Sequence, residues 1–190
     1  APDATVGTAT ITVKVDDKDG QKLSATCVIT IEEYSVPRYG LYAGDITEGD
    51  YIFKANGATY FMNNTINSSR LTNVASEDNP DIINNVITTD AEAYVWHIAK
   101  SGDYWTIQNL ANNKYAAGTG TKNQAQLLEV CTDNMAKWTI TYDETNDVYT
   151  FENLGRSQAS SDSNNKYLRN NDNTGWACYA SGTGNDITLY

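Results

Sequence analysis

The chain repeats one pattern of apolar and polar positions three times. Each copy opens with a strand that starts on an aromatic residue and closes with a strand of the form Trp-x-Ile or an aliphatic equivalent. The opening positions are Tyr51, Trp105 and Tyr149, and the closing positions are Trp96, Trp138 and Ile187. A unit that is too small to bury its own apolar face shares one core with its copies. The pattern therefore predicts an all-β fold of three pseudo-repeats and twelve short strands, a β-trefoil, with the three closing residues at matching sites in one core.

A turn rich in asparagine follows the opening strand of each copy. In the second and third copies the turn reads Asn-Asn-Lys-Tyr and ends at Tyr115 and Tyr167, and in the first copy Asn-Gly precedes Tyr60. Asn and Gly tolerate the left-handed backbone that a tight turn needs, and we expect each tyrosine to return to the core. The first copy carries an insertion around residues 77–80 and the third carries one over residues 154–164. Insertions of this kind fall in loops.

Residues 1–33 lie outside the repeat. Apolar and polar residues alternate with a period of two over residues 7–15 and again over 23–31, and a polar turn separates the two stretches. This pattern predicts an antiparallel β-hairpin with one apolar face that needs cover. Residues 32–37 carry the charge and the proline of a linker, and residues 34–43 are predicted to form the linker and lead-in. The domain boundary is therefore placed near that proline, and the trefoil is expected to span residues 44–190.

The charge of the chain restricts its partners. The sequence has 24 acidic and 13 basic residues, a net charge of -11 and a pI near 4.3. This excess of negative charge repels phosphate groups, so we expect binding neither to nucleic acid nor to a membrane surface. No run of residues approaches the roughly 20 apolar residues of a membrane span, so insertion into a membrane is not expected either.

The chain has three cysteines, Cys27, Cys131 and Cys178. They cannot all pair within the chain, and none stands in a spacing that is typical of zinc ligands. We interpret them as small buried residues, with a disulfide between Cys131 and Cys178 as the alternative. No metal and no other cofactor is predicted.

The repeat resembles a known family. Two opening strands read Trp105-Thr-Ile-Gln-Asn109 and Tyr149-Thr-Phe-Glu-Asn153. Together with the three closing strands they resemble the ricin-type β-trefoil lectin family over about residues 44–190, which implies a β-trefoil with a lectin-like function. The family closes each repeat with Gln-x-Trp, whereas the positions two before the closing residue are here Tyr94, Ala136 and Asn185. The family's sugar-binding residues therefore cannot be assigned to positions in this chain.

Two further resemblances concern the ends of the chain. The segments GTATITV and ATCVITI of the hairpin resemble the last two strands of bacterial Ig-like domains. The stretch from Tyr167 to Tyr190 is similar to the termini of surface proteins of gut Bacteroidetes. These resemblances imply that residues 1–33 are the C-terminal hairpin of a bacterial Ig-like domain. They also imply that the trefoil belongs to a longer multidomain protein that is secreted or lies on the bacterial cell surface.

The sequence gives little support for catalysis. The single histidine, His97, stands between Trp96 and Ile98 in a closing strand and should point away from the face that these two residues occupy. No motif with a Ser or Cys nucleophile accompanies it. Adjacent acids such as Asp143 and Glu144 are typical of solvated turns. We therefore expect that the protein is not an enzyme.

Aromatic residues are the strongest candidates for binding. The C–H face of a sugar stacks on an aromatic ring, while amides and carboxylates hold its hydroxyl groups. The candidates are the aromatic residues that the repeat does not need for packing, with the polar residues beside them. They are Tyr104, Tyr115, Trp176, Tyr179, Asp103, Asn112, Asn113, Asn171 and Asp172.

The alternation of side chains along a strand restricts where these candidates point. Tyr104 should face outward if its neighbour Trp105 faces inward. The strand that begins at Trp176 has two possible arrangements. Either Trp176 and Cys178 face inward and Tyr179 faces outward, which the preference of cysteine for burial favours, or the reverse holds.

Two hypotheses about function stay open. The first is a non-catalytic carbohydrate-binding module of a secreted or cell-surface bacterial protein, with a glycan of unknown class as its partner. The alternative is a structural or protein-interaction trefoil, resembling an adhesin or an inhibitor, with no sugar site. Exposed aromatic residues with Asp and Asn in hydrogen-bond reach favour the first hypothesis, and a single long ordered loop favours the second.

Overall fold

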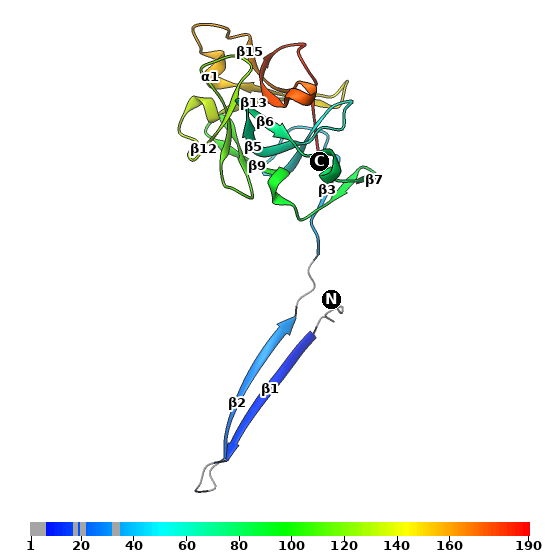
Figure 1. Ribbon diagram of the computed structural model, residues 1–190, viewed down its shortest axis with the longest axis vertical. Coiled ribbons are helices and arrows are strands. Elements are labelled where there is room, and N and C mark those ends of the chain that lie inside the picture. Colours follow the sequence, from blue (N-terminus) through cyan, green and yellow to red (C-terminus); the bar gives the residue numbers. More distant parts are fainter. Residues whose placement is uncertain (1–6, 17–18, 20–21, 32–34) are drawn as a thin grey trace. The chain divides into compact units, whose positions relative to one another are not determined.

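The computed structural model describes residues 7–16, 19, 22–31 and 35–190. The chain divides into two units, residues 1–36 and residues 37–190. Each unit is built from antiparallel strands (Figure 1).

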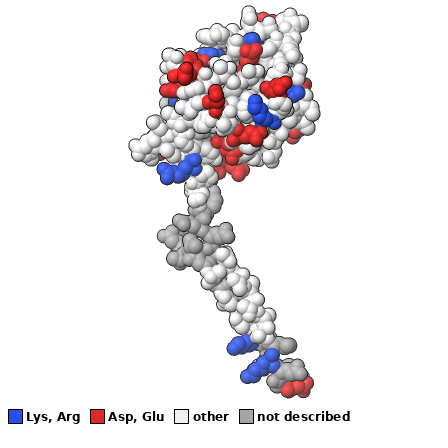
Figure 2. Space-filling view, turned by 180° about the vertical axis from the view of Figure 1, so that it is seen from behind, with Lys and Arg blue, Asp and Glu red and all other residues white. Residues whose placement is uncertain are grey.

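The first unit contains the predicted β-hairpin. Strands β1 (Gly7–Asp16) and β2 (Lys22–Ile31) pair in one unbroken register, from Gly7 opposite Ile31 to Asp16 opposite Lys22. The register places Ile11 opposite Cys27 and Val13 opposite Ala25, so these apolar residues share one face. Ile11 and Val13 are 52% and 56% exposed. Figure 2 shows that the charged side chains of the hairpin lie near its turn, while its length is uncharged.

The second unit contains one sheet of twelve strands in three sets of four. The first set is β4 (Gly49–Ala55), β5 (Met62–Asn67), β6 (Arg70–Asn73) and β9 (Val95–Ser101). The second is β10 (Tyr104–Asn109), β11 (Tyr115–Gly118), β12 (Ala125–Leu128) and β13 (Trp138–Asp143). The third is β14 (Val148–Asn153), β15 (Asn165–Asn170), β16 (Trp176–Ala180) and β17 (Ile187–Leu189). The predicted β-trefoil of three repeats is confirmed.

The first and fourth strands of the three sets close a barrel. Strand β4 pairs with β9, β9 with β10, β10 with β13, β13 with β14, β14 with β17, and β17 pairs with β4 again. The second and third strands of each set form the hairpins β5–β6, β11–β12 and β15–β16. Because the barrel has no free edge, its backbone polar groups are satisfied inside the ring.

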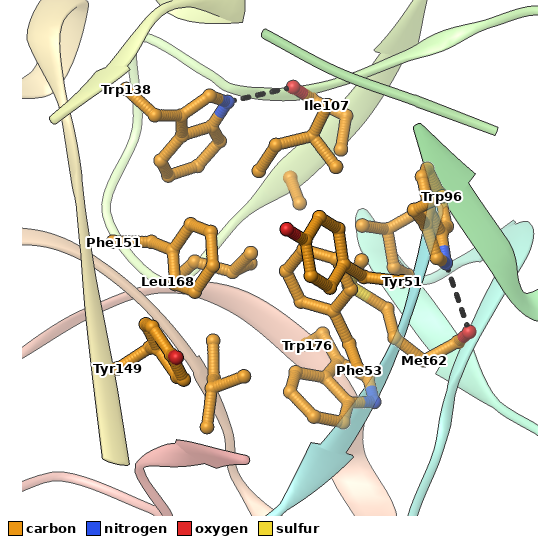
Figure 3. Close-up of a cluster of buried hydrophobic side chains, with 14 of the residues drawn as sticks. Tyr51, Phe53, Met62, Trp96, Ile107, Trp138, Tyr149, Phe151, Leu168 and Trp176 are labelled. Carbon is orange, nitrogen blue, oxygen red and sulfur yellow. Dashed lines mark hydrogen bonds between the residues drawn. The ribbon is translucent and has the colours of Figure 1, made fainter. Parts of the chain in front are cut away.

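The closing residues occupy equivalent positions in the core, as the repeat predicts. In register, Tyr51 lies opposite Trp96, Trp105 opposite Trp138, and Tyr149 opposite Ile187. All three closing residues are buried. The indole nitrogens of the two tryptophans donate to backbone carbonyls of the neighbouring hairpins, Trp96 to Met62 at 3.2 Å and Trp138 to Ala116 at 3.1 Å (Figure 3). The hydrogen bond fixes each ring at the base of its hairpin.

The tyrosines of the Asn-Asn-Lys-Tyr turns do not return to the core. Tyr115 lies opposite Gln108 and Tyr167 lies opposite Glu152, and these residues are half-buried. Partners in register point to the same side of the sheet. The outward-facing Gln108 and Glu152 therefore keep the tyrosines outward, and the next residue, Ala116 or Leu168, fills the core. The expectation for these tyrosines was wrong by one position.

Two buried asparagines hold the short helical turns that precede the closing strands. Asn109 of β10 donates through Nδ2 to the carbonyls of Glu92, Ala93 and Val95, at 3.2, 2.9 and 3.0 Å. These carbonyls belong to η2 (Glu92–Tyr94) and the start of β9. Asn153 of β14 donates in the same way to the carbonyl of Met135, at 2.7 Å, in η3 (Asn134–Ala136). Ala55 occupies the equivalent position in the first repeat.

The remaining elements lie outside the repeat pattern. A small sheet joins β3 (Arg38–Gly40), β8 (Val86–Thr88) and β7 (Ile82–Ile83), so part of the predicted lead-in forms a strand. The other short elements are η1 (Ser76–Asp78), η4 (Asp172–Thr174) and α1 (Leu154–Ser157). Among the described residues, none of the helices has the length and apolar character that crossing a membrane requires.

All three cysteines are free, so the alternative of a disulfide between Cys131 and Cys178 is wrong. Cys178 is fully buried in β16, as expected of a small apolar residue. Cys27 is exposed and Cys131 is half-buried, so the expectation of burial was wrong for these two residues. Burial disfavours the charged thiolate and raises the pKa of the Cys178 thiol to about 12. The buried thiol is therefore uncharged at neutral pH.

Candidate functional site

Seven of the nine predicted site residues lie in or beside three separate turns. Asp103 lies between β9 and β10, and Tyr104 is the first residue of β10. Asn112 and Asn113 lie between β10 and β11, and Tyr115 is the first residue of β11. Asn171 and Asp172 lie between β15 and β16. All seven are exposed or half-buried.

The two half-buried aromatic candidates, Tyr104 and Tyr115, do not form one platform. Tyr115 pairs with Gln108, which stands four residues along β10 from Tyr104. This spacing separates the two tyrosine positions by about 13 Å at about 3.3 Å per residue.

The other two candidates, Trp176 and Tyr179, are buried. Trp176 is 0% and Tyr179 is 2% exposed, and both residues between them are buried as well. Strand β16 pairs with β15 at one edge and with β6 at the other. Its side chains from Trp176 to Tyr179 are all buried, so both faces of the strand are covered. Trp176 and Cys178 face the interior as expected, but the prediction that Tyr179 faces outward is wrong. Neither ring offers a face to a ligand.

The predicted orientation of His97 is correct. Its side chain is 40% exposed, whereas Trp96 and Ile98 are buried. Its Nδ1 lies 2.7 Å from Oδ1 of Asp50, which is itself 45% exposed. This is a surface pair of the first and fourth strands of one repeat. Among the described residues, no three His, Cys, Asp or Glu side chains gather as metal ligands do.

A different part of the trefoil contains a pocket. Its volume is about 570 Å³, which is within the range of small-molecule sites. It lies between the β5–β6 hairpin, the segment that follows β6, and the turn η4; Figure 1 shows β5 and β6. Fifteen residues line it: Thr59, Tyr60, Asn67, Ser68, Arg70, Leu71, Thr72, Asn73, Val74, Ala75, Ser76, Asn79, Asn173, Thr174 and Gly175.

The insertion of the first repeat forms one wall of this pocket. The connection between the third and fourth strands covers residues 74–94 in the first repeat, 129–137 in the second and 181–186 in the third. The longer connection holds η1 and the β7–β8 hairpin, and four of its residues line the pocket: Val74, Ala75, Ser76 and Asn79. The threefold pattern is therefore broken where the pocket lies.

Arg70 is the one charged residue in the lining. It starts β6 directly after the two-residue turn Ser68–Ser69, whose φ angles of 49° and 61° are those of a tight hairpin turn. Its Nε donates to the Tyr179 hydroxyl at 3.0 Å, and its Nη1 donates to the Ser68 carbonyl at 3.2 Å. The hydroxyl of the buried Tyr179 thus fixes the position of the guanidinium group.

Tyr60 provides the aromatic ring of the lining. The ring is half-buried, and its hydroxyl donates to Oδ1 of Asn173 at 2.8 Å, which ties the start of β5 to η4 across the pocket. Asn79 of the insertion donates through Nδ2 to the Thr59 carbonyl at 3.0 Å. Both bonds link segments that are distant in the sequence, so the walls hold one another in place.

The base of the pocket is held by a chain of amides. Asn170 donates through Nδ2 to Oδ1 of Asn73 at 2.8 Å, and Asn73 donates to the Asp172 carbonyl at 3.0 Å. Beside them, Gly175 has a φ of 92°, and a Cβ atom there would lie 2.4 Å from the Leu71 carbonyl oxygen. Only glycine allows β16 to approach β6 this closely.

Sequence reasoning missed both Tyr60 and Arg70 as site residues. Tyr60 was assigned to the core, and Arg70 stands in no motif. The signal that points to them is the insertion, because a repeat with a longer connection has an extra loop that can flank its own hairpin.

The comparison with protein families supports the fold. A family model described as "Ricin-type beta-trefoil lectin domain-like" matches residues 92–170. This segment is ricin-type β-trefoil lectin-like. It covers β9, the second repeat and the third repeat as far as β15. The pocket residues, at 59–79 and 173–175, lie outside it, so the family match does not assign them a role. No curated protein sequence matches the chain.

Solved structures with the same fold include lectins and an enzyme. The lectin of Polyporus squamosus, bound to the epitope Neu5Aca2-6Galb1-4GlcNAc, has a TM-score of 0.54 at 14% identity over 77% of this chain. The BEL β-trefoil has a TM-score of 0.53 at 10% identity, over 79% of this chain and 97% of its own. A GlcNAcα1-4Gal-releasing endo-β-galactosidase of Clostridium perfringens has a TM-score of 0.53 at 12% identity over 74% of this chain. The chain spans 50% of the Polyporus lectin and 31% of the Clostridium enzyme.

Proposed function

We propose that the trefoil of residues 37–190 is a non-catalytic carbohydrate-binding module. The observation that carries this proposal is the pocket, in which an aromatic ring, a guanidinium group and side-chain amides line one hollow. A sugar ring presents an apolar C–H face and a rim of hydroxyl groups. Tyr60 offers a ring to the first, and Arg70, Asn79 and Asn173 offer donors and acceptors to the second.

The rigidity of the pocket supports this function. The bonds of Tyr60 to Asn173 and of Asn79 to Thr59 hold these side chains through contacts within the protein, so a sugar does not have to order them when it binds. The lectin-like segment at residues 92–170 supports the same class of ligand. So does the Polyporus lectin, which has this fold and is bound to a saccharide.

We also propose a setting for this module. The hairpin of residues 7–31 has the apolar pairs Ile11 with Cys27 and Val13 with Ala25 on one face, with Ile11 and Val13 more than half exposed. A two-stranded hairpin with an exposed apolar face needs further strands to cover it. The sequence of the hairpin resembles the last two strands of a bacterial Ig-like domain, and the other strands of such a domain would cover this face. On this proposal the trefoil is one part of a multidomain bacterial protein that is secreted or on the cell surface.

A glycan array tests the proposed function. The array should carry neutral, acidic and amino sugars, and the whole 190-residue chain should bind a subset of them. We expect dissociation constants between millimolar and micromolar, roughly 4–8 kcal/mol of binding free energy. Tyr60→Ala should lose this binding, because the ring is the apolar platform. Tyr104→Ala, which removes a half-buried tyrosine on another turn, is the matched control and should bind as the unmodified chain does.

One outcome would count against this function, and another against the pocket as its site. If no glycan on the array binds, the structural or protein-interaction alternative becomes the better account. If Tyr104→Ala abolishes binding and Tyr60→Ala does not, the trefoil binds sugar through another turn, and the pocket is not the site.

A further inference from the structure

The pocket is electrostatically unlike the rest of the chain. The sequence has 24 acidic and 13 basic residues, and Asp and Glu side chains are spread over the face of residues 37–190 that Figure 2 shows. None of the fifteen lining residues is acidic, and one, Arg70, is basic. An anion that approaches most of this surface is repelled, whereas inside the pocket it meets a cation.

The guanidinium group of Arg70 is only partly engaged within the protein. Its Nε and Nη1 each donate one hydrogen bond, to Tyr179 and to Ser68, and both acceptors are uncharged. Within the described part of the chain, Arg70 forms no ion pair and its Nη2 has no hydrogen-bond partner. A guanidinium group has five N–H donors in a planar fork that matches the two oxygens of a carboxylate.

We propose that the sugar bound in this pocket carries a carboxylate, as uronic and sialic acids do, and that Arg70 binds this group. This inference rests on the proposed carbohydrate-binding function. A charge-assisted, bidentate hydrogen bond is about twice as strong as a bond between neutral groups. The planar carboxylate fits the fork better than a single hydroxyl group does, so the charged sugar is preferred over its neutral parent.

The acidic residues nearest in sequence do not cancel this preference. Glu77 and Asp78 lie in η1 beside the lining residue Ser76, and Asp172 lies in η4 beside the lining residue Asn173. All three are exposed to solvent. Charges that are exposed to water are screened over about 8 Å at physiological salt, whereas a carboxylate in contact with Arg70 is screened much less.

Tyr179 is the positioning residue for Arg70. Its ring is buried in β16, and its hydroxyl accepts the Nε bond of Arg70. A phenylalanine at this position keeps the ring and its packing but leaves the guanidinium without this anchor. Tyr179→Phe therefore tests the orientation of Arg70 without removing its charge.

The test compares charged and neutral sugars that are otherwise alike. Methyl β-D-glucuronide and methyl β-D-glucoside form one pair, and methyl α-N-acetylneuraminide and its uncharged C1 amide form the other, each titrated into the whole chain by NMR. We expect the charged member of at least one pair to bind on the order of tenfold more tightly, and added salt to reduce this difference.

Variants assign the difference to Arg70. Arg70→Gln should lower the affinity for the charged sugar to that of its neutral parent and leave the neutral sugar unchanged. Tyr179→Phe should lower the same discrimination in part. Arg38→Gln makes the same change of net charge on the exposed strand β3, outside the lining, and should have no effect. Thermal unfolding of each variant shows that it is folded, and Tyr179→Phe preserves the test if Arg70→Gln does not fold.

The outcomes separate this inference from the proposed function. Equal binding of charged and neutral sugars, unchanged in Arg70→Gln, would overturn the carboxylate assignment while the carbohydrate-binding function stands. Equal discrimination in Arg70→Gln and in the unmodified chain would overturn the role of Arg70. Binding of no sugar at all would overturn both proposals.

Discussion

The asparagine that links successive repeats gives the sharpest test of the fold. Asn109→Ala removes a fully buried side chain whose amide forms hydrogen bonds through both its nitrogen and its oxygen. On one side, Nδ2 donates to three carbonyls of residues 92–95. On the other side, Oδ1 accepts from the backbone N–H groups of Ala111 and Asn112, at 3.1 and 3.3 Å, and from Nδ2 of Asn64, at 2.9 Å.

The loss in the free energy of unfolding can be estimated from these contacts. An amide has two donor hydrogens and an acceptor oxygen with two lone pairs, so about four of the six contacts can be fully formed at once. Each contributes about 1 kcal/mol net. Glu92 and Ala111 are exposed, so water can reach part of what the side chain leaves behind. Asn109→Ala should therefore lower the free energy of unfolding by about 3–4 kcal/mol.

The equivalent residue of the next repeat is the matched comparison. Asn153 donates to Met135 at 2.7 Å and to Lys137 at a longer 3.4 Å, and its Oδ1 accepts from the N–H of Arg156 at 3.0 Å. With about two good bonds, Asn153→Ala should cost about 2 kcal/mol.

Urea unfolding followed by tryptophan fluorescence measures both costs, because all four tryptophans lie in residues 37–190. A loss of less than about 0.5 kcal/mol in the free energy of unfolding for Asn109→Ala would refute the stabilising role of the Asn109 hydrogen bonds, since an ordinary surface substitution has an effect of that size. So would a larger cost for Asn153→Ala than for Asn109→Ala.

Arg156→Met removes a fully buried guanidinium that donates to the carbonyls of residues 119, 120, 162 and 165, and should cost about 3–5 kcal/mol in urea unfolding. The raised pKa of Cys178 means that the unfolded thiol ionises first, so stability should fall as pH rises from about 9 towards 12, and less steeply in Cys178→Ala. Deleting residues 1–36 should leave the thermal transition of the trefoil in place, and its loss would show that the boundary at Pro37 is misplaced. Calorimetric titration of the best glycan should give one site per chain, and a stoichiometry of three would contradict the assignment to the insertion of the first repeat.

The fold could be predicted because its core positions recur. The pairs Tyr51 with Trp96, Trp105 with Trp138 and Tyr149 with Ile187 are register partners in the closed barrel, and the sequence shows the same residue types at each. The large aromatic side chains at these positions supply much of the buried surface, so few other residues can replace them. A shared core therefore leaves a trace in the sequence of every copy.

The alternation of side chains along a strand predicted burial less well than the repeat predicted the core, for a physical reason. It assumes that one face of a strand meets the core and the other meets water. Strand β16 violates this assumption, because it pairs with β15 at one edge and β6 at the other, and Trp176, Cys178 and Tyr179 are all buried. No local pattern could show that the hairpins of different repeats pack on one another at the end of the barrel.

The position of the pocket follows from the same division between core and loops. A residue that packs in the barrel must suit all three repeats at once, because each copy contributes to one core. The connection after β6 is free of this demand: it spans residues 74–94, whereas its counterparts in the other two repeats are shorter. That segment lines the same pocket as Arg70, which directly follows the β5–β6 turn. The hydroxyl of the buried Tyr179, in the third repeat, orients the Arg70 guanidinium group. The core thus supplies a rigid support, and the loop that differs from its counterparts supplies the wall. This is why the site lies in one repeat of three, although the sequence repeats its core positions in all of them.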